Sequence, residues 1–358
     1  MSFKFKISGR AAISFMFGII CAVITIWLLG AMFCRNYTPF VYFKDLKRNG
    51  YKPGIKIHMT REGFATTAVG SDGAIAPDVS WDNPSGFVLM LGNSYAEGAH
   101  VKDADKLHRI ANAALRKNGN VPQIINVAMS SQFIGDFVWQ LEHYEKKYNN
   151  KIKAVIIVLA GNCYYPRFES DYGGKLQKNS LKQYCFAAPK PRRDSAYLFN
   201  RMKYNFDLNA FLVIGHLWQT SKLNFSPGPH KTEIKSCRTN VSDFNYINDC
   251  LRKIRSVTDV PILLLWAEEI PAISKGQIIY AKKTETGNVV SAMAKTNSLD
   301  FISMTDTYNE FVKKNKKMVT GPLNIPPGTG HWNRDGHRIT AEKIVEYLNG
   351  VFDEGDKK

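Results

Sequence analysis

Two polar segments far apart in the chain contain the side chains of a nucleophile and a base. Ser94 lies in GNSYAEG, residues 92–98, and His331 lies in GHWNRDGH, residues 330–337. A serine on a tight turn between a strand and a helix is exposed, and a base can activate its hydroxyl. A histidine in a loop can take up that proton at neutral pH. A single serine in such a turn, or a single loop histidine, more often has only a structural role or lies at the surface. Together the two segments predict a Ser–His pair.

A third polar side chain could stabilise a developing oxyanion. Asn162 follows the apolar run 154–160 and Gly161. An amide that donates to an oxyanion contributes about 2.7–4 kcal/mol to a transition state. An asparagine that only caps a turn is the structural alternative.

The segments around these residues predict a parallel sheet covered by helices. Apolar runs typical of buried strands are found at residues 87–91, 123–128, 154–160, 260–266 and, more briefly, 300–302. Helical spacing is found at residues 105–117, 137–148, 274–297 and 338–348. This alternation indicates an α/β fold, in which ligands bind at the carboxyl ends of the strands. Ser94 and Asn162 both follow such ends.

The same segments resemble the SGNH (GDSL-like) hydrolases. The similarity covers roughly residues 86–351 and rests on GNSYAEG, the serines after Asn126, the AGN of residues 160–162 and HWNRDGH. It implies a flavodoxin-like, three-layer α/β/α domain with a mostly parallel sheet. It also implies that Ser94 is the nucleophile and His331 its base. The oxyanion donors would be the Ser94 and Ser131 main-chain N–H groups and the Asn162 side chain.

The acid of the expected triad has no counterpart in the last motif. The family has an Asp two or three residues before the His, where this chain has Gly328 and Thr329. We consider three substitutes: a main-chain carbonyl or Thr329, giving a Ser–His dyad, or Asp335 reaching His331 in the fold. Loss of the acid costs a serine protease about 10⁴ in rate. Two smaller departures are Asn93, in place of the family Asp, and Cys163, where an Asp often follows the Asn.

The first 85 residues predict an anchor and a connecting segment. Residues 11–33 form a run without charge, and this run is slightly longer than the ~20 residues that cross a bilayer as a helix. Residues 1–10 are basic and would stay in the cytoplasm. We therefore expect a single-pass bacterial inner-membrane protein with a periplasmic or otherwise extracytoplasmic domain. Residues 34–85 would form a stalk with short strands, and residues 86–352 the hydrolase domain, with an insertion at about 164–256.

Charge and cysteine content narrow the partners. The chain has 358 residues, a net charge of +17, and six cysteines. Its basic clusters would attract acidic polysaccharide or anionic lipid, although a solvated surface is equally consistent with each cluster. No metal-ligand spacing, cofactor motif or nucleic-acid motif is present. The four cysteines after residue 86 could form disulfides in an oxidising compartment, with connectivity left open.

Two functions remain from different classes. The first is a serine esterase or O-acyl (O-acetyl) transferase acting on a cell-envelope or exported polysaccharide through an acyl-enzyme on Ser94. Lipase and thioesterase activities belong to the same family. The second is a non-catalytic polysaccharide-binding or assembly subunit whose site has lost its acid. The joint presence of Ser94, Asn162 and His331 favours the enzyme.

Overall fold

The structure is a computed structural model of the chain. It describes residues 9–33, 40–46, 48–59, 62–118, 121–130, 132–161, 241–274, 276–323 and 325–353. The chain divides into two compact units, one containing residues 1–37 and 192–231, the other containing residues 38–191 and 232–358. The second unit contains the sheet and the predicted catalytic residues.

Five parallel strands form the central sheet of the second unit. They are β5 (Phe87–Gly92), β6 (Ile124–Asn126), β7 (Ile152–Ala160), β8 (Ile262–Ala267) and β11 (Asp300–Ser303). Their spatial order, β11-β8-β7-β5-β6, is the 2-1-3-4-5 order of flavodoxin-like folds. The predicted α/β class with a parallel sheet is confirmed, and each predicted strand agrees with an observed one.

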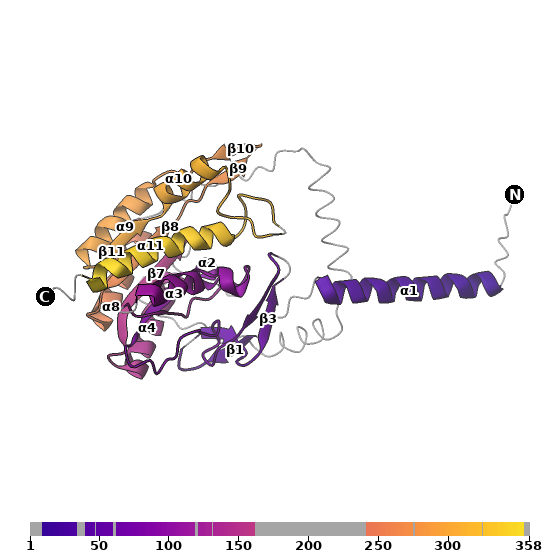
Figure 1. Ribbon diagram of the computed structural model, residues 1–358, viewed down its shortest axis with the longest axis horizontal. Coiled ribbons are helices and arrows are strands. Elements are labelled where there is room, and N and C mark those ends of the chain that lie inside the picture. Colours follow the sequence, from indigo (N-terminus) through magenta and orange to yellow (C-terminus); the bar gives the residue numbers. More distant parts are fainter. Residues whose placement is uncertain are drawn as a thin grey trace. The chain divides into compact units, whose positions relative to one another are not determined.

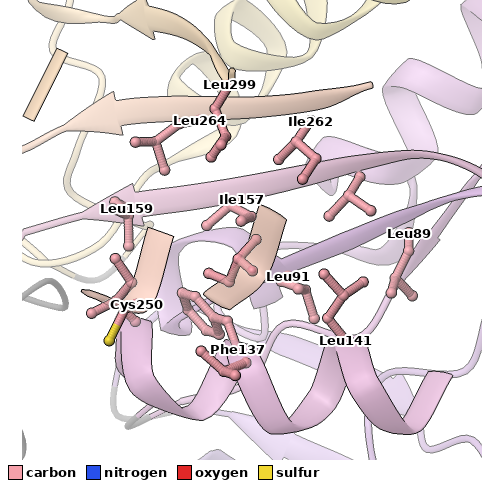
Figure 2. Close-up of a cluster of buried hydrophobic side chains, with 14 of the residues drawn as sticks. Leu89, Leu91, Phe137, Leu141, Ile157, Leu159, Cys250, Ile262, Leu264 and Leu299 are labelled. Carbon is pink, nitrogen blue, oxygen red and sulfur yellow. The ribbon is translucent and has the colours of Figure 1, made fainter. Parts of the chain in front are cut away.

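Two helical layers cover the sheet because alternate strand residues point to opposite faces. Leu89 and Leu91 face the layer of α4 (Ile134–Tyr148), α8 (Val241–Val257) and α9 (Glu285–Thr296). Val88 and Met90 face the layer of α3 (Leu107–Asn118), α10 (Thr305–Asn315) and α11 (Arg334–Asp353). Figure 1 shows these helices beside the strands, and Figure 2 shows strand side chains meeting Phe137 and Leu141 of α4.

Residues 38–85 belong to the same compact unit as the sheet. They form two antiparallel pairs, β1 (Phe40–Phe43) with β2 (Arg48–Tyr51), and β3 (Lys56–Met59) with β4 (Ala65–Ala68). A small core joins these strands to Ala99 and Met129, in the loops after β5 and β6. Buried Arg48 also donates to the Val127 carbonyl at 3.0 Å. The segment expected to be a stalk therefore packs directly beside the carboxyl ends of the central strands.

Two sequence-based expectations differ from the structure. Residues 274–297 were expected to be helical, but β9 (Ala272–Ser274) pairs with β10 (Gln277–Ile279) before α9 begins. The insertion expected at about 164–256 contains α8, whose Ile247 and Leu251 belong to the main core. The rest of that insertion, residues 164–240, lies outside the described residues, as do Cys163, Cys185 and Cys237.

The predicted membrane span, residues 11–33, lies in α1 (Gly9–Phe33). Within the described part of the chain, no helix has both the length and the apolar character needed to cross a bilayer. The structure thus supports a helix at this position and does not support the span.

Candidate active site

Ser94 lies where β5 meets the short helix α2 (Ser94–Glu97). Asn93 caps this helix, since its Oδ1 accepts from Tyr95 N at 3.1 Å, and its Nδ2 donates to the Ala160 carbonyl at 2.8 Å. A Cβ at Gly92 would lie 2.7 Å from the Ala96 Cβ, so the turn needs glycine there. Asn93 therefore ties the serine turn to the end of β7.

His331 lies in the loop before α11, and its Nε2 is 2.8 Å from Ser94 Oγ. Two contacts fix this loop. Trp332 is fully buried in the core, and Asn333 caps α11 by accepting from the Asp335 and Gly336 main-chain N–H groups. Ser94 and His331, which are 237 residues apart in the sequence, are therefore brought together as predicted.

The carboxylate that contacts His331 comes from an unexpected segment. Glu62, between β3 and β4, places Oε1 2.8 Å from His331 Nδ1 and 2.6 Å from His331 N. The substitutes considered from the sequence have other partners: Thr329 Oγ1 donates to the Pro326 carbonyl, and Asp335 lies 3.6 Å from Arg338. The sequence assigns residues 34–85 to a stalk with short strands and predicts no site residue there. No motif marks Glu62 in the sequence, and only the fold brings it to His331.

Close packing leaves room for this carboxylate and holds it. Gly330 has φ +63°, and a Cβ there would lie 2.3 Å from Glu62 Oε1, so a side chain would collide with the acid. Gly63 has φ +75°, and its Cβ would lie 1.9 Å from the His100 carbonyl oxygen. Glycines at these two positions are therefore required for Glu62 to approach His331.

A buried lysine anchors the β3–β4 pair that carries Glu62. Lys106 is fully buried, and its Nζ donates to Thr67 Oγ1 of β4 at 2.9 Å. The same ammonium donates to the carbonyls of Gly98 and Val101, in the loop that follows α2, at 3.0 and 2.8 Å. Burial lowers the pKa of Lys106 to about 8, although the charge of Asp103 opposes this. The lysine thus connects the hairpin that carries Glu62 to the loop that follows the helix of Ser94.

The charges at the site allow His331 to accept a proton from Ser94. Burial alone would raise the pKa of Glu62, but the hydrogen bonds and charge of His331 outweigh burial and lower that pKa below its usual value. An ionised carboxylate can only accept, so His331 Nδ1 carries a hydrogen. Its Nε2 is then free to accept the Ser94 hydroxyl proton. The side chains of His331 and Glu62 remain 24% and 20% exposed, so a substrate can reach them.

Two predicted oxyanion donors, Ser131 and Asn162, lie outside the described residues. Their neighbours are described. Ser130 donates from both N and Oγ to Glu97 Oε2. Burial raises the pKa of Glu97, against the hydrogen bonds from Ser130. At the end of β7, Gly161 N donates to the Ala267 carbonyl at 3.1 Å. The loops that precede both predicted donors are therefore held at the carboxyl edge of the sheet.

Glu62, His100 and His331 also have the side-chain types of a metal site, with ligand atoms within 4.8 Å of one another. The two imidazoles, however, are stacked at 4.0 Å with an interplanar angle of 27°. Lone pairs lie in the ring planes, so those of stacked rings do not converge on one ion. Both nitrogens of His331 also have partners already. The arrangement fits a hydrogen-bonded acid–base pair better than a metal centre.

A pocket of about 200 Å³ lies at the carboxyl ends of β8 and β11. Its lining includes Trp266, Phe301, Glu268 and Lys282. In the sheet, β8 is two strands from β5, which corresponds to about 10 Å at the usual strand spacing. The pocket and Ser94 therefore both lie at the carboxyl ends of the strands, at the same end of the sheet.

No protein-family model matches the sequence, and no curated protein matches it. Solved structures that are similar in fold include an acetyl xylan esterase, with 13% identity, a TM-score of 0.40, and coverage of 73% of this chain and 98% of that one. A GDSL-like lipase from Bacteroides thetaiotaomicron has 14% identity, a TM-score of 0.35, and coverage of 76% and 92%. A two-domain esterase active on acetylated mannans has 12% identity, a TM-score of 0.40, and coverage of 75% and 50%. At these values the likenesses do not carry a functional assignment, which depends on the geometry of the site.

Proposed function

We propose that the protein is a serine esterase or O-acyl transferase of the SGNH type, with Ser94, His331 and Glu62 as its catalytic triad. One observation carries the proposal: an unbroken chain of hydrogen bonds runs from Glu62 Oε1 to His331 Nδ1 and from His331 Nε2 to Ser94 Oγ, each 2.8 Å long. Geometry of this kind, and not sequence order, identifies a triad on any fold.

Each group has one task in the reaction. Ser94 Oγ attacks the ester carbonyl carbon while His331 Nε2 takes the hydroxyl proton, and Glu62 stabilises the resulting imidazolium. The C–O bond to the alcohol then breaks, and the alcohol leaves with the proton from His331. The acyl-enzyme on Ser94 is released by water or by another hydroxyl, whose proton returns through His331. Main-chain N–H of Ser94 and Ser131 and the side chain of Asn162 are the proposed oxyanion donors.

We propose an O-acetylated polysaccharide as the substrate, at a location outside a bacterial inner membrane. The net charge of +17 favours an acidic polymer. The pocket at β8 and β11 offers aromatic and charged side chains two to three strands from β5, which precedes Ser94, and we propose that a neighbouring sugar unit binds there. The alternative of a non-catalytic binding subunit depended on the missing acid, and Glu62 removes that reason.

The first test is hydrolysis of p-nitrophenyl acetate by the purified full-length chain. Ser94→Ala and His331→Ala should abolish release of nitrophenol. Matched controls are Ser256→Ala, an exposed serine on α8, and His143→Ala, on α4. Both controls should keep the parent rate. If the parent and all four variants are equally inert while folded, the proposed activity is wrong for simple esters.

A second test addresses the substrate. Acetate release from acetylated xylan should depend on Ser94 as nitrophenol release does. Incubating p-nitrophenyl acetate with deacetylated xylan separates transfer from hydrolysis, since acetyl groups appear on the polymer only if a sugar hydroxyl attacks the acyl-enzyme. Activity on the small ester with neither polymer reaction would support the triad and reject a xylan-like polysaccharide.

A further inference from the structure

His100 is a buried imidazole in contact with both the acid and the base. It is 6% exposed and follows α2 by three residues. Its Nδ1 is 3.1 Å from the Glu62 carbonyl oxygen, and its ring stacks on His331 at 4.0 Å. A carbonyl only accepts, so Nδ1 carries the hydrogen. Its Nε2 is buried and has no hydrogen-bond partner among the described residues.

The surroundings of His100 keep its ring uncharged. Burial, with the nearby charge of His331, lowers the pKa of His100 to about 4, while Glu62 acts in the opposite direction. The positive charge of Lys106, which precedes α3, also lowers the pKa of His100. His337 of α11 interacts electrostatically with His100 as well. Near neutral pH, His100 therefore donates one hydrogen bond without competing for the proton that His331 must carry.

We propose that His100 is a positioning residue that keeps the acid and the base of the triad within hydrogen-bond distance of each other. Its Nδ1–H fixes the main chain of Glu62, and its ring forms one wall against the imidazole of His331. This inference deepens the proposed function and rests on it. Neither the predicted site residues nor the triad chemistry includes His100.

The geometry shows why such a wall matters. His331 must keep Nδ1 on Glu62 and Nε2 on Ser94 at the same time, so rotation of the ring breaks one of the two bonds. Tyr95 covers His331 at 4.9 Å with a tilted ring and donates to the Gly330 carbonyl at 3.3 Å. His100 stacks on the same imidazole at 4.0 Å, so the ring of His331 has two aromatic neighbours, Tyr95 and His100. Displacements of about 1 Å at a catalytic group can cost about 100-fold in rate.

Three substitutions separate the two contacts of His100. His100→Asn keeps a donor near the position of Nδ1 and removes the ring, His100→Phe keeps a ring and removes the donor, and His100→Leu removes both. We expect kcat on p-nitrophenyl acetate to fall about 10- to 100-fold in the Leu variant. The Asn and Phe variants should lie between it and the parent, and KM should change less than about threefold, because His100 is not proposed to touch the substrate.

His108→Leu is the matched control. His108 is also buried, burial lowers its pKa to about 3, and its described hydrogen bond is to Asn126. Its replacement should cost stability while the folded enzyme keeps kcat within about threefold. If His108→Leu lowers kcat as much as His100→Leu, or if His100→Leu retains parent kcat, the positioning role is refuted.

An NMR measurement tests the same inference without turnover. The proton between His331 Nδ1 and Glu62 should give a far-downfield resonance in the parent and in His108→Leu. The resonance should be lost or broadened in His100→Leu. A parent that shows the resonance but hydrolyses no ester would refute the proposed activity alone. A resonance unchanged by His100→Leu would refute the positioning role alone.

Discussion

Replacement of Glu62 by Gln tests the triad at the position that the fold alone reveals. Glu62 Oε1 accepts from both the main-chain N and Nδ1 of His331, at 2.6 and 2.8 Å. An amide oxygen can still accept these bonds, but it carries no charge to stabilise the imidazolium that forms when Ser94 gives up its proton. The substitution therefore removes charge while keeping the size of the side chain.

The expected loss follows from the strength of that contact. A hydrogen bond to a charged group contributes about 1.5–3 kcal/mol, which corresponds to roughly 10- to 150-fold in rate. If the amide NH₂ turns toward Nδ1, the imidazole takes the wrong tautomer, and in serine proteases this costs about 10⁴. We therefore expect kcat of Glu62→Gln to fall by about 10- to 10⁴-fold, with KM little changed.

The assay is steady-state hydrolysis of p-nitrophenyl acetate, with folding checked by circular dichroism. Thr329→Val and Asp335→Asn are the controls, because these residues were the alternatives considered from the sequence and neither contacts the His331 ring among the described contacts. Both should retain activity within about threefold. A Glu62→Gln enzyme as active as these controls would refute the assignment of Glu62.

Three further predictions follow from the packing around the site. Gly63→Ala should lower both stability and kcat, since a Cβ would lie 1.9 Å from the His100 carbonyl oxygen at a φ of +75°; strain of this kind costs about 1–3 kcal/mol, measurable by urea denaturation. Lys106→Met should lower the free energy of unfolding by about 1–3 kcal/mol, because Thr67 and two carbonyls lose their donor; an unchanged Tm would contradict this. Stability should fall as the pH falls from 6.5 toward 4, because His100 protonates at about 6.5 when unfolded and at about 4 when folded, so the unfolded chain binds more protons in this window. His100 contributes about 3 kcal/mol to this change. His108, His143 and His337, whose pKa values burial also lowers, add losses in the same direction, as does Glu62 below its usual pKa of 4.5. His100→Asn should therefore reduce the slope between pH 4.5 and 6.5 without removing it, and an unaltered slope would count against the cause.

The central sheet could be predicted closely because its strands are buried on both faces. Continuous apolar runs such as residues 154–160 have few alternatives once helical segments separate them. The observed β7, Ile152–Ala160, begins only two residues earlier. The paired strands β9 and β10 were missed because three-residue strands leave almost no periodic pattern, and their exposed side chains add none.

Ser94 and His331 could be recognised by sequence alone because each lies in a compact local motif. The turn at Ser94 needs glycine at 92 and a cap at 93, and the loop at His331 needs the cap of Asn333. Such requirements involve residues that are close in sequence, so they leave a pattern that can be read along the chain.

Glu62 and His100 were decided by tertiary structure. Glu62 reaches His331 across 269 residues, and it does so from a hairpin that packs through Ile57 and Val69 against the loops after β5 and β6. A carboxylate needs only one oxygen within hydrogen-bond distance of the imidazole, which imposes no spacing on its neighbours in sequence. Local patterns along the chain were therefore enough to predict the sheet and the contact between Ser94 and His331, while the packing of a separate hairpin decides which carboxylate lies against His331.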